Sequence, residues 1–172
     1  MPKSTLLKGK VVLAVDDEPD VLDLISEQLS ECQVHQAETY ETALQHLMSY
    51  TYDIVILDIM GVNGFDLLKH SVARGFPTVM LTAHALSPES IKKSIKLGAV
   101  SFLPKESLPA LSSFLEDVLS GGGKSAWRRV FDRLGGFFEQ RFGPDWKKKD
   151  KFFQRFEEEI REILDDKAGR KT

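Results

Sequence analysis

Five side chains of this 172-residue sequence could together handle a phosphoryl group and a metal ion. Each stands directly after, or close behind, a short apolar run: Asp16, Asp17, Asp58, Thr82 and Lys105. Three carboxylates that converge repel one another, and a hard divalent cation such as Mg²⁺ is their usual neutralising partner. A hydroxyl donor and a compact ammonium charge suit phosphoryl oxygens. An aspartate that faces both the cation and these donors would be a phosphate acceptor.

The elements that must position these side chains can be read from the apolar pattern. Short runs rich in β-branched residues predict strands at residues 11–15, 33–37, 53–57, 78–81 and 99–103. Segments with helical periodicity lie between them, with a proline start at Pro19, a cap at Thr39, an opening at Gly64 and a capped start at Ser87-Pro88. A fifth helix is predicted from about residue 107 to residue 119.

This alternation predicts an α/β fold with a doubly wound, five-stranded parallel sheet, the flavodoxin-like (βα)5 arrangement. Ligands of such sheets bind outside the carboxyl ends of the strands. The five side chains named above all fall at those ends, so the predicted fold would gather them in one crevice.

At these positions the sequence resembles the response-regulator receiver domain of two-component signalling, over residues from about 10 to 120. The resemblance rests on Asp16-Asp17, on Asp58 after the run 53–57, on Thr82-Ala83, and on Lys105 after the run 98–103. It implies a Mg²⁺-dependent domain that accepts a phosphoryl group from a histidine kinase or a phosphotransfer protein. Such a domain is not an enzyme, apart from assisting its own phosphorylation and dephosphorylation.

The resemblance also implies a role for each matching residue. Asp58 would be the phospho-acceptor, while Thr82 and Lys105 would bind the phosphoryl oxygens. The Mg²⁺ ligands would be Asp17 directly, Asp16 mostly through water, Asp58, and the backbone carbonyl of Met60. Phe102 stands where the family keeps a switch aromatic, and movement of Thr82 would let it follow.

Three details depart from the family pattern. The segment 58–64 lacks the usual proline and reaches its helix-opening Gly64 about two residues early. Lys105 is followed by Glu106, where the family commonly has proline with a cis bond; a cis bond before a non-proline residue costs about 2.5–4 kcal/mol, and the sequence leaves the isomer open. The sequence also leaves open whether His84 speeds or slows dephosphorylation.

Residues 121–172 differ from the rest in charge and in aromatic content. Residues 1–120 carry 9 Lys and Arg against 16 Asp and Glu, a net charge of −7, whereas residues 121–172 carry 14 against 10, a net charge of +4. Nine of the sixteen aromatic residues also lie after residue 120. We therefore predict a receiver domain at 1–120, a glycine-rich linker at 121–124 and a helical output extension at 125–172.

The apolar face of the predicted helical hairpin must be covered by something, since two helices alone bury little surface. Packing on a downstream protein, or on the chain itself within one molecule or across a homodimer, is favoured. A membrane surface and nucleic acid are less favoured occupants, although the lysine-rich segment 147–151, with Trp146 and Phe152, could contact either.

Two other functions are compatible with parts of the sequence. A receiver-like adaptor would act through its tail independently of phosphorylation. An aspartate-nucleophile phosphohydrolase also uses a strand-end aspartate with Mg²⁺, but its motif carries a second aspartate two residues on, where this chain has Met60. The histidines His35, His46 and His70 show no metal-site spacing along the sequence.

Composition narrows the class of protein further. Charged residues make up 28% and hydrophobic residues 42% of the chain, values close to the globular average. No apolar stretch approaches the roughly 20 residues that span a bilayer. A single cysteine, Cys32, cannot form an internal disulfide, and no signal-peptide pattern begins the chain, so we expect a cytoplasmic protein.

Overall fold

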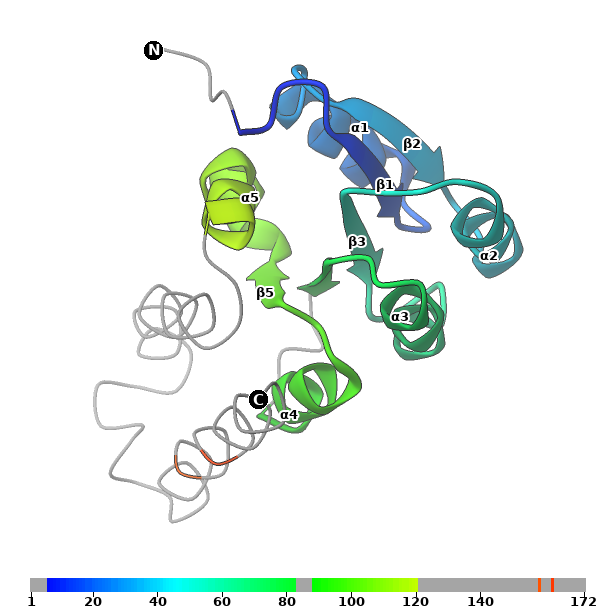
Figure 1. Cartoon of the computed structure of the whole chain (residues 1–172), viewed down its shortest axis with the longest axis vertical. Coiled ribbons are helices and arrows are strands. Elements are labelled where there is room, and N and C mark those ends of the chain that lie inside the picture. Colours follow the sequence, from blue (N-terminus) through cyan, green and yellow to red (C-terminus); the bar gives the residue numbers. More distant parts are fainter. Residues whose placement is uncertain (1–5, 83–87, 121–157, 159–161, 163–172) are drawn as a thin grey trace.

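The computed structural model describes residues 6–82 and 88–120, together with Glu158 and Glu162. Five parallel strands form one sheet in the order β2-β1-β3-β4-β5 (Figure 1). The strands are β1 (Val11–Val15), β2 (Gln33–Ala37), β3 (Ile54–Asp58), β4 (Thr78–Thr82) and β5 (Ser101–Pro104). The predicted flavodoxin-like sheet is therefore confirmed.

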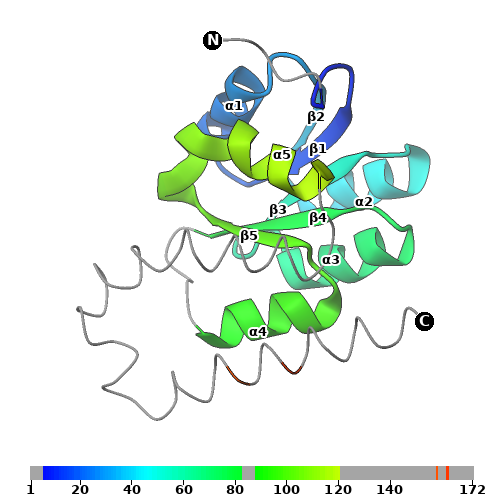
Figure 2. The same ribbon diagram turned by 60° about the vertical axis from the view of Figure 1, so that its left-hand side comes forward.

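Helices cover both faces of this sheet (Figure 2). They are α1 (Pro19–Gln28), α2 (Tyr40–Ser49), α3 (Gly64–Ala73), α4 (Pro88–Leu97) and α5 (Leu111–Ser120), with a 3-10 helix, η1 (Lys105–Ala110), before α5. Alternate residues of β1 point to opposite faces: Leu13 packs in a core with α2, α3 and α4, while Val12 packs in a second core with α1 and α5. Both cores are apolar, which is why the central strands read as continuous hydrophobic runs.

The helices begin at the residues that local sequence signals predicted. Pro19 occupies the first turn of α1, where its missing N–H costs no hydrogen bond. The Thr39 side chain accepts a hydrogen bond from the backbone N–H of Thr42 and caps α2. The starts of α3 at Gly64 and of α4 at Pro88 also agree with the sequence.

Several predicted boundaries were wrong by one or two residues. The third strand begins at Ile54. The carboxylate of Asp53 accepts a hydrogen bond from the backbone N–H of Val11 at 2.8 Å, so that this N–H is bonded to a side chain and not to the backbone of the neighbouring strand. Asp58 and Thr82 are the last residues of their strands and still pair with neighbouring strands. The fifth strand begins at Ser101 rather than at residue 99.

The last predicted helix also differs from the observed one. A 3-10 turn from Lys105 comes first, and the α-helix starts only at Leu111. Pro109 lies inside this 3-10 helix, and the α-helix begins two residues after it. The α-helix ends at Ser120, next to the predicted linker.

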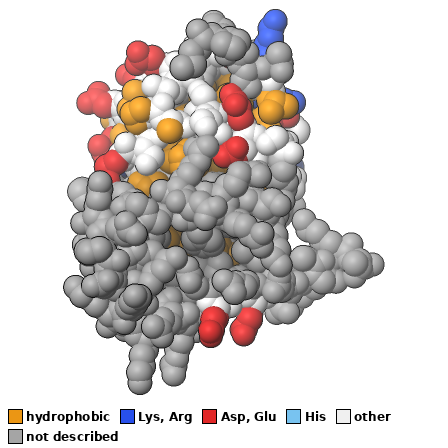
Figure 3. All heavy atoms as spheres, turned by 90° about the vertical axis from the view of Figure 1, so that its left-hand side faces the viewer, with side chains coloured by type: hydrophobic (Ala, Val, Ile, Leu, Met, Phe, Trp, Pro, Cys, Tyr) orange, Lys and Arg blue, Asp and Glu red, His pale blue; other side chains and the backbone are white. Residues whose placement is uncertain are grey.

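The predicted linker and helical extension lie outside the described residues, apart from Glu158 and Glu162, which are helical and exposed. Within the described part of the chain no helix is long and apolar enough to cross a membrane. Acidic side chains are scattered over the described part of the face in Figure 3, as the negative balance of residues 1–120 predicts.

Candidate functional site

The strand order brings the predicted acidic residues together. Strands β1 and β3 are neighbours, and the chain crosses to opposite sides of the sheet from them, which makes the carboxyl ends of these two strands the topological switch point. Asp16 follows β1 and Asp58 ends β3. Both carboxylates are buried, with Asp16 fully so and Asp58 only 4% exposed. Two buried acids side by side need a positive partner.

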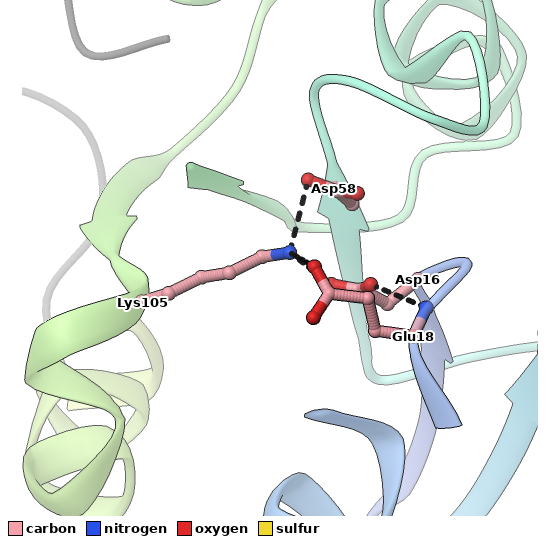
Figure 4. Close-up of polar contacts among 4 residues, drawn as sticks. All are labelled: Asp16, Glu18, Asp58 and Lys105. Carbon is pink, nitrogen blue, oxygen red and sulfur yellow. Dashed lines mark hydrogen bonds and ion pairs between the residues drawn. The ribbon is translucent and has the colours of Figure 1, made fainter. Parts of the chain in front are cut away.

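Lys105 supplies that partner from the far side of the crevice (Figure 4). Its Nζ lies 2.8 Å from Asp16 Oδ2 and 3.6 Å from Asp58 Oδ1. The side chain reaches across from the end of β5, which is two strands away from β3 in the sheet. One ammonium group therefore bridges the two buried carboxylates, and three strand ends converge on a single charge cluster.

The electrostatics of this cluster are unbalanced without a further cation. Burial, followed by the negative charge of Asp16, raises the pKa of Asp58 to about 7, although Lys105 acts in the opposite direction. Burial also raises the pKa of Asp16. Burial works against the charge on Lys105, but contacts with Asp16 and Asp58 outweigh it and raise the lysine pKa. The site holds more negative charge than one lysine neutralises.

The excess negative charge and the carboxylate oxygens of this site suit a divalent cation. Asp16 Oδ2 meets the described residues only through its ion pair with Lys105 and receives no hydrogen bond of good geometry from them. Carboxylate oxygens of Asp16, Asp17 and Glu18 lie within 4.8 Å of one another. Oxygen ligands of this kind are those that Mg²⁺ takes.

The loop after β3 closes on the same carboxylates. Gly61 has a positive φ of 85°, and a Cβ at this position would lie 2.7 Å from Asp17 Oδ1. The backbone that follows Met60 therefore passes directly against the Asp17 carboxylate, and the positive φ at position 61 favours glycine. The exposed Met60 side chain points away from the core, at 64% exposure, so any role of Met60 here belongs to its backbone.

Gly64 is required for a different reason. A Cβ at Gly64 would lie 2.1 Å from the backbone carbonyl oxygen of Asp58, which is a hard clash. The Gly64 N–H donates to the carbonyl of Ile59 at 3.2 Å and holds the start of α3 beneath the strand end. The short loop that the sequence showed to lack a proline is thus closed by this approach of α3 to the acceptor strand.

Thr82 and Phe102 lie on the neighbouring strands. Thr82 ends β4 and is 1% exposed, and its Oγ1 has no hydrogen-bond partner among the described residues. Phe102 is fully buried in the core that packs under α2, α3 and α4, and it pairs with Met80 of β4. A buried hydroxyl without a partner at a strand end is a donor available to a ligand.

Glu18 is a contact of the site that the sequence reasoning missed. Its Oε1 lies 3.4 Å from Lys105 Nζ, and its backbone N–H donates to Asp16 Oδ1 at 2.9 Å. The backbone bond orients the Asp16 carboxylate, and the side chain adds a third carboxylate to the lysine. The only signal in the sequence was its position directly after Asp16-Asp17.

Of the two details that the sequence left open, one can be placed. The peptide bonds of the described residues are all trans, including the one between Lys105 and Glu106. His84 lies outside the described residues.

The profile of the response regulator receiver domain matches residues 12–114, which cover the five strands except for Val11, and the whole site. The chain belongs to this receiver domain family. Membership confirms the resemblance stated from the sequence, and it makes the described part of the chain a receiver domain, which is a signalling domain.

Among curated relatives of this receiver domain, the two-component response regulator ARR18 of Arabidopsis thaliana is 38% identical over 103 residues, covering 56% of this chain and 16% of the relative. The probable transcriptional regulatory protein SilR of Salmonella typhimurium is 34% identical over 100 residues, covering 55% of this chain and 43% of the relative. The chain therefore matches less than half the length of these relatives, and the shared part is the receiver domain.

Solved structures share the fold. Chemotaxis protein CheY4 of Vibrio cholerae aligns with a TM-score of 0.59 and 29% identity, covering 64% of this chain and 99% of that chain. A response regulator from Thermotoga maritima aligns with a TM-score of 0.60 and 21% identity, covering 66% of this chain and 99% of that one. The second similarity concerns the fold alone.

Proposed function

We propose that Asp58 of this receiver domain accepts a phosphoryl group from a histidine kinase or a phosphotransfer protein, and that the modified domain signals to an output partner. The observation that carries the proposal is the Lys105 ammonium group, which bridges the buried Asp16 and Asp58 at a strand-end crevice. An ammonium group held at this position can bind an oxygen of a transferring phosphoryl group without first having to move.

The transfer would be a displacement at phosphorus. An oxygen of the Asp58 carboxylate forms the new P–O bond while the P–N bond to the donor imidazole breaks, and the imidazole nitrogen keeps the electron pair. No proton needs to be removed from the acceptor in its ionised form. Lys105 would hold one equatorial phosphoryl oxygen and the Thr82 hydroxyl another, so that the chain mainly positions and neutralises.

Asp16, Asp17, Asp58 and the carbonyl of Met60 would hold Mg²⁺ at this site. The ion would supply positive charge to the transferring phosphoryl oxygens and offset the repulsion among the acids. The unbalanced charge around Asp58, the close passage of the loop at Gly61 against Asp17, and the oxygen donor set support this assignment.

Phosphorylation would then replace the single negative charge of the ionised Asp58 carboxylate with the roughly 1.5–2 negative charges of the phosphoryl group, and it would add new acceptor oxygens. The buried Thr82 hydroxyl, which has no partner among the described residues, would turn to them. Phe102 lies on the adjacent strand and would follow, so that α4, β5 and α5 shift. The extension at 125–172 would pass the change to a downstream protein or to a second copy of the chain.

The test uses a small phosphodonor such as acetyl phosphate with Mg²⁺ and the full chain. Intact mass should show one added phosphoryl group that hydroxylamine releases, and peptide mapping should place it on Asp58. Asp58→Asn should abolish uptake, whereas Asp66→Asn, a partly exposed aspartate of α3, should leave it intact. Full modification of Asp58→Asn, or a phosphoryl group mapped to serine or histidine, would refute the proposal.

Neither alternative function gains support from the structure. A phosphohydrolase needs a second acid two residues after the acceptor, and the exposed Met60 occupies that position. One relative is named a probable cyclic di-GMP phosphodiesterase, from Vibrio cholerae, but the match covers only 25% of it. A cytoplasmic location is part of the same proposal, because the proposed kinase or phosphotransfer partner would act there.

A further inference from the structure

The fold brings two histidines into contact at the edge of the sheet, although they are eleven positions apart in the sequence. His35 lies on the edge strand β2, and His46 lies in the last turn of α2. Their ring centroids are 6.0 Å apart. Both side chains are partly buried, and Tyr50, which contacts both rings, is 50% exposed. The pair therefore sits at the protein surface rather than deep in the core.

Each imidazole is oriented through the same ring nitrogen. His46 Nδ1 lies 2.7 Å from the backbone carbonyl of Thr42, and since a carbonyl only accepts, Nδ1 must carry the hydrogen. In the neutral ring the lone pair is then on Nε2. His35 Nδ1 lies 2.8 Å from the Tyr52 hydroxyl, which can accept the Nδ1 hydrogen in the same way. Both rings thus have a hydrogen-bond partner on Nδ1, which leaves Nε2 as the ligand atom.

We propose that His35 and His46 bind one divalent transition-metal ion of the zinc type through their Nε2 atoms. Metal-bound histidines almost always donate the other ring N–H to a carbonyl or similar acceptor, and that is the arrangement here. Two imidazoles that share a tetrahedral Zn²⁺ at about 2.0–2.1 Å place their ring centres roughly 5 Å apart. The observed 6.0 Å is therefore about 1 Å longer, and the rings must move together by that amount to hold the ion. Water would complete the coordination from the exposed side.

This site is separate from the phosphoryl site in position and in chemistry. His46 lies near the C-terminal end of α2, whereas the acidic crevice lies at the carboxyl ends of β1 and β3. Imidazole nitrogens favour zinc, nickel and copper, while carboxylate and carbonyl oxygens favour Mg²⁺. Saturating Mg²⁺ should therefore fill the acidic site and leave the histidine pair available. A bound ion would tie the edge strand to α2.

The experiment titrates the full chain with Zn²⁺ by calorimetry in saturating Mg²⁺. We expect one equivalent of Zn²⁺ to bind, and His35→Ala and His46→Ala each to abolish that event. The double variant should lose no more than either single variant, because both rings hold one ion. His70→Ala is the matched control, since His70 is a partly exposed histidine on α3 that pairs with Asp66, and it should bind like the wild type.

A structural effect of the substitutions must be distinguished from loss of ligation. Tyr52→Phe keeps the buried ring and removes only the hydroxyl at His35, so it should weaken Zn²⁺ affinity by about 10-fold or more while the fold remains. Zn²⁺ should also raise the unfolding temperature of the wild type but not of His46→Ala. No uptake by the wild type, unchanged uptake in either histidine variant, or losses that add independently would each overturn the proposal.

Discussion

Lys105 is paired more closely with Asp16 than with Asp58. Its Nζ lies 2.8 Å from Asp16 Oδ2 and 3.6 Å from Asp58 Oδ1, so the acceptor carboxylate is the less tightly held of the two. Asp16 is also fixed by the backbone N–H of Glu18. The lysine is thus anchored at one end of the crevice and placed within reach of a phosphoryl group on Asp58.

The first prediction concerns removal of this lysine. Lys105→Met should lower the free energy of unfolding by about 1–3 kcal/mol in Mg²⁺-free buffer at pH 8, because two buried carboxylates lose their only described cation. This decrease in the free energy of unfolding is smaller than it would be for two carboxylates that stay charged, since Asp58 can take up a proton. Urea unfolding measures it, and Lys69→Met, an exposed lysine of α3, should change stability by less than about 0.5 kcal/mol. Equal stabilities of the two variants would contradict the buried pairing.

The second prediction concerns pH. The pKa of Asp58 is raised from 3.8 to about 7 in the folded protein, so the folded state holds this proton more tightly than the unfolded state. The stabilisation is complete below pH 3.8 and is lost as the pH rises through about 7, by up to about 4 kcal/mol. Asp58→Asn should lack this loss, so that in EDTA it becomes more stable than the wild type as the pH approaches 8. Urea unfolding from pH 4 to pH 8 tests this, and parallel curves for the two proteins would contradict it.

The third prediction concerns the affinity for Mg²⁺ and its dependence on pH. A proton on Asp58 competes with Mg²⁺, so the affinity for Mg²⁺ should fall as the pH is lowered through about 7. Asp17→Ala should weaken binding at every pH, whereas Asp20→Ala, an exposed acid at the start of α1, should not. Calorimetric titration with Mg²⁺ at pH 6 and pH 8 gives both comparisons. Equal affinities of wild type and Asp17→Ala would remove Asp17 from the ligand set.

The fourth prediction concerns the close approach of α3 to the acceptor strand. Gly64→Ala should destabilise the protein by about 1–3 kcal/mol and slow phosphorylation, because the new methyl group would lie 2.1 Å from the Asp58 carbonyl oxygen and push the acceptor backbone aside. Gly75→Ala is the control: its φ of 80° also disfavours alanine, but it meets no atom within 4 Å and lies at the other end of α3. Its phosphorylation rate should match the wild type. Normal rates for Gly64→Ala would show that the loop tolerates the shift.

The sequence predicted the strand-end residues well because apolar runs stop where the chain leaves the core. Asp16, Asp58 and Thr82 could each be placed at a strand end from hydrophobicity alone, and the parallel topology then brought Asp16 and Asp58 together. Which carboxylate Lys105 prefers was not predictable. That depends on side-chain reach and on how η1 begins, and both are set by three-dimensional packing.

The contact between His35 and His46 was missed for a related reason. Metal-site motifs are recognised by spacing along one element, whereas these residues come from a strand and a helix that meet only through the docking of α2 on the sheet. The start of the third strand was also misplaced, because the apolar pattern carries no sign that the Asp53 side chain would bond the backbone of Val11. Tertiary contacts set these details.

The last prediction concerns which part of the chain accepts the phosphoryl group and which part binds the output partner. A fragment of residues 1–120 contains all five strands and every described residue of the site, so it should fold and accept a phosphoryl group at the rate of the full chain. It should differ in partner binding and in oligomeric state, since the tail carries nine aromatic residues and a net charge of +4 beside the receiver's −7. Exposed charge pairs contribute only about 0–1 kcal/mol each, so burial of the aromatic side chains must supply most of the affinity.

Sedimentation and partner capture with the fragment and the full chain, each with and without phosphodonor, measure these differences. If the fragment matches the full chain in oligomeric state and partner binding, the tail is not the output element. If the isolated tail instead binds nucleic acid with a steep dependence on salt, release of counterions rather than protein contact explains its basic charge. A change in tail-dependent binding on phosphorylation, lost in Asp58→Asn, would link the acceptor to the output.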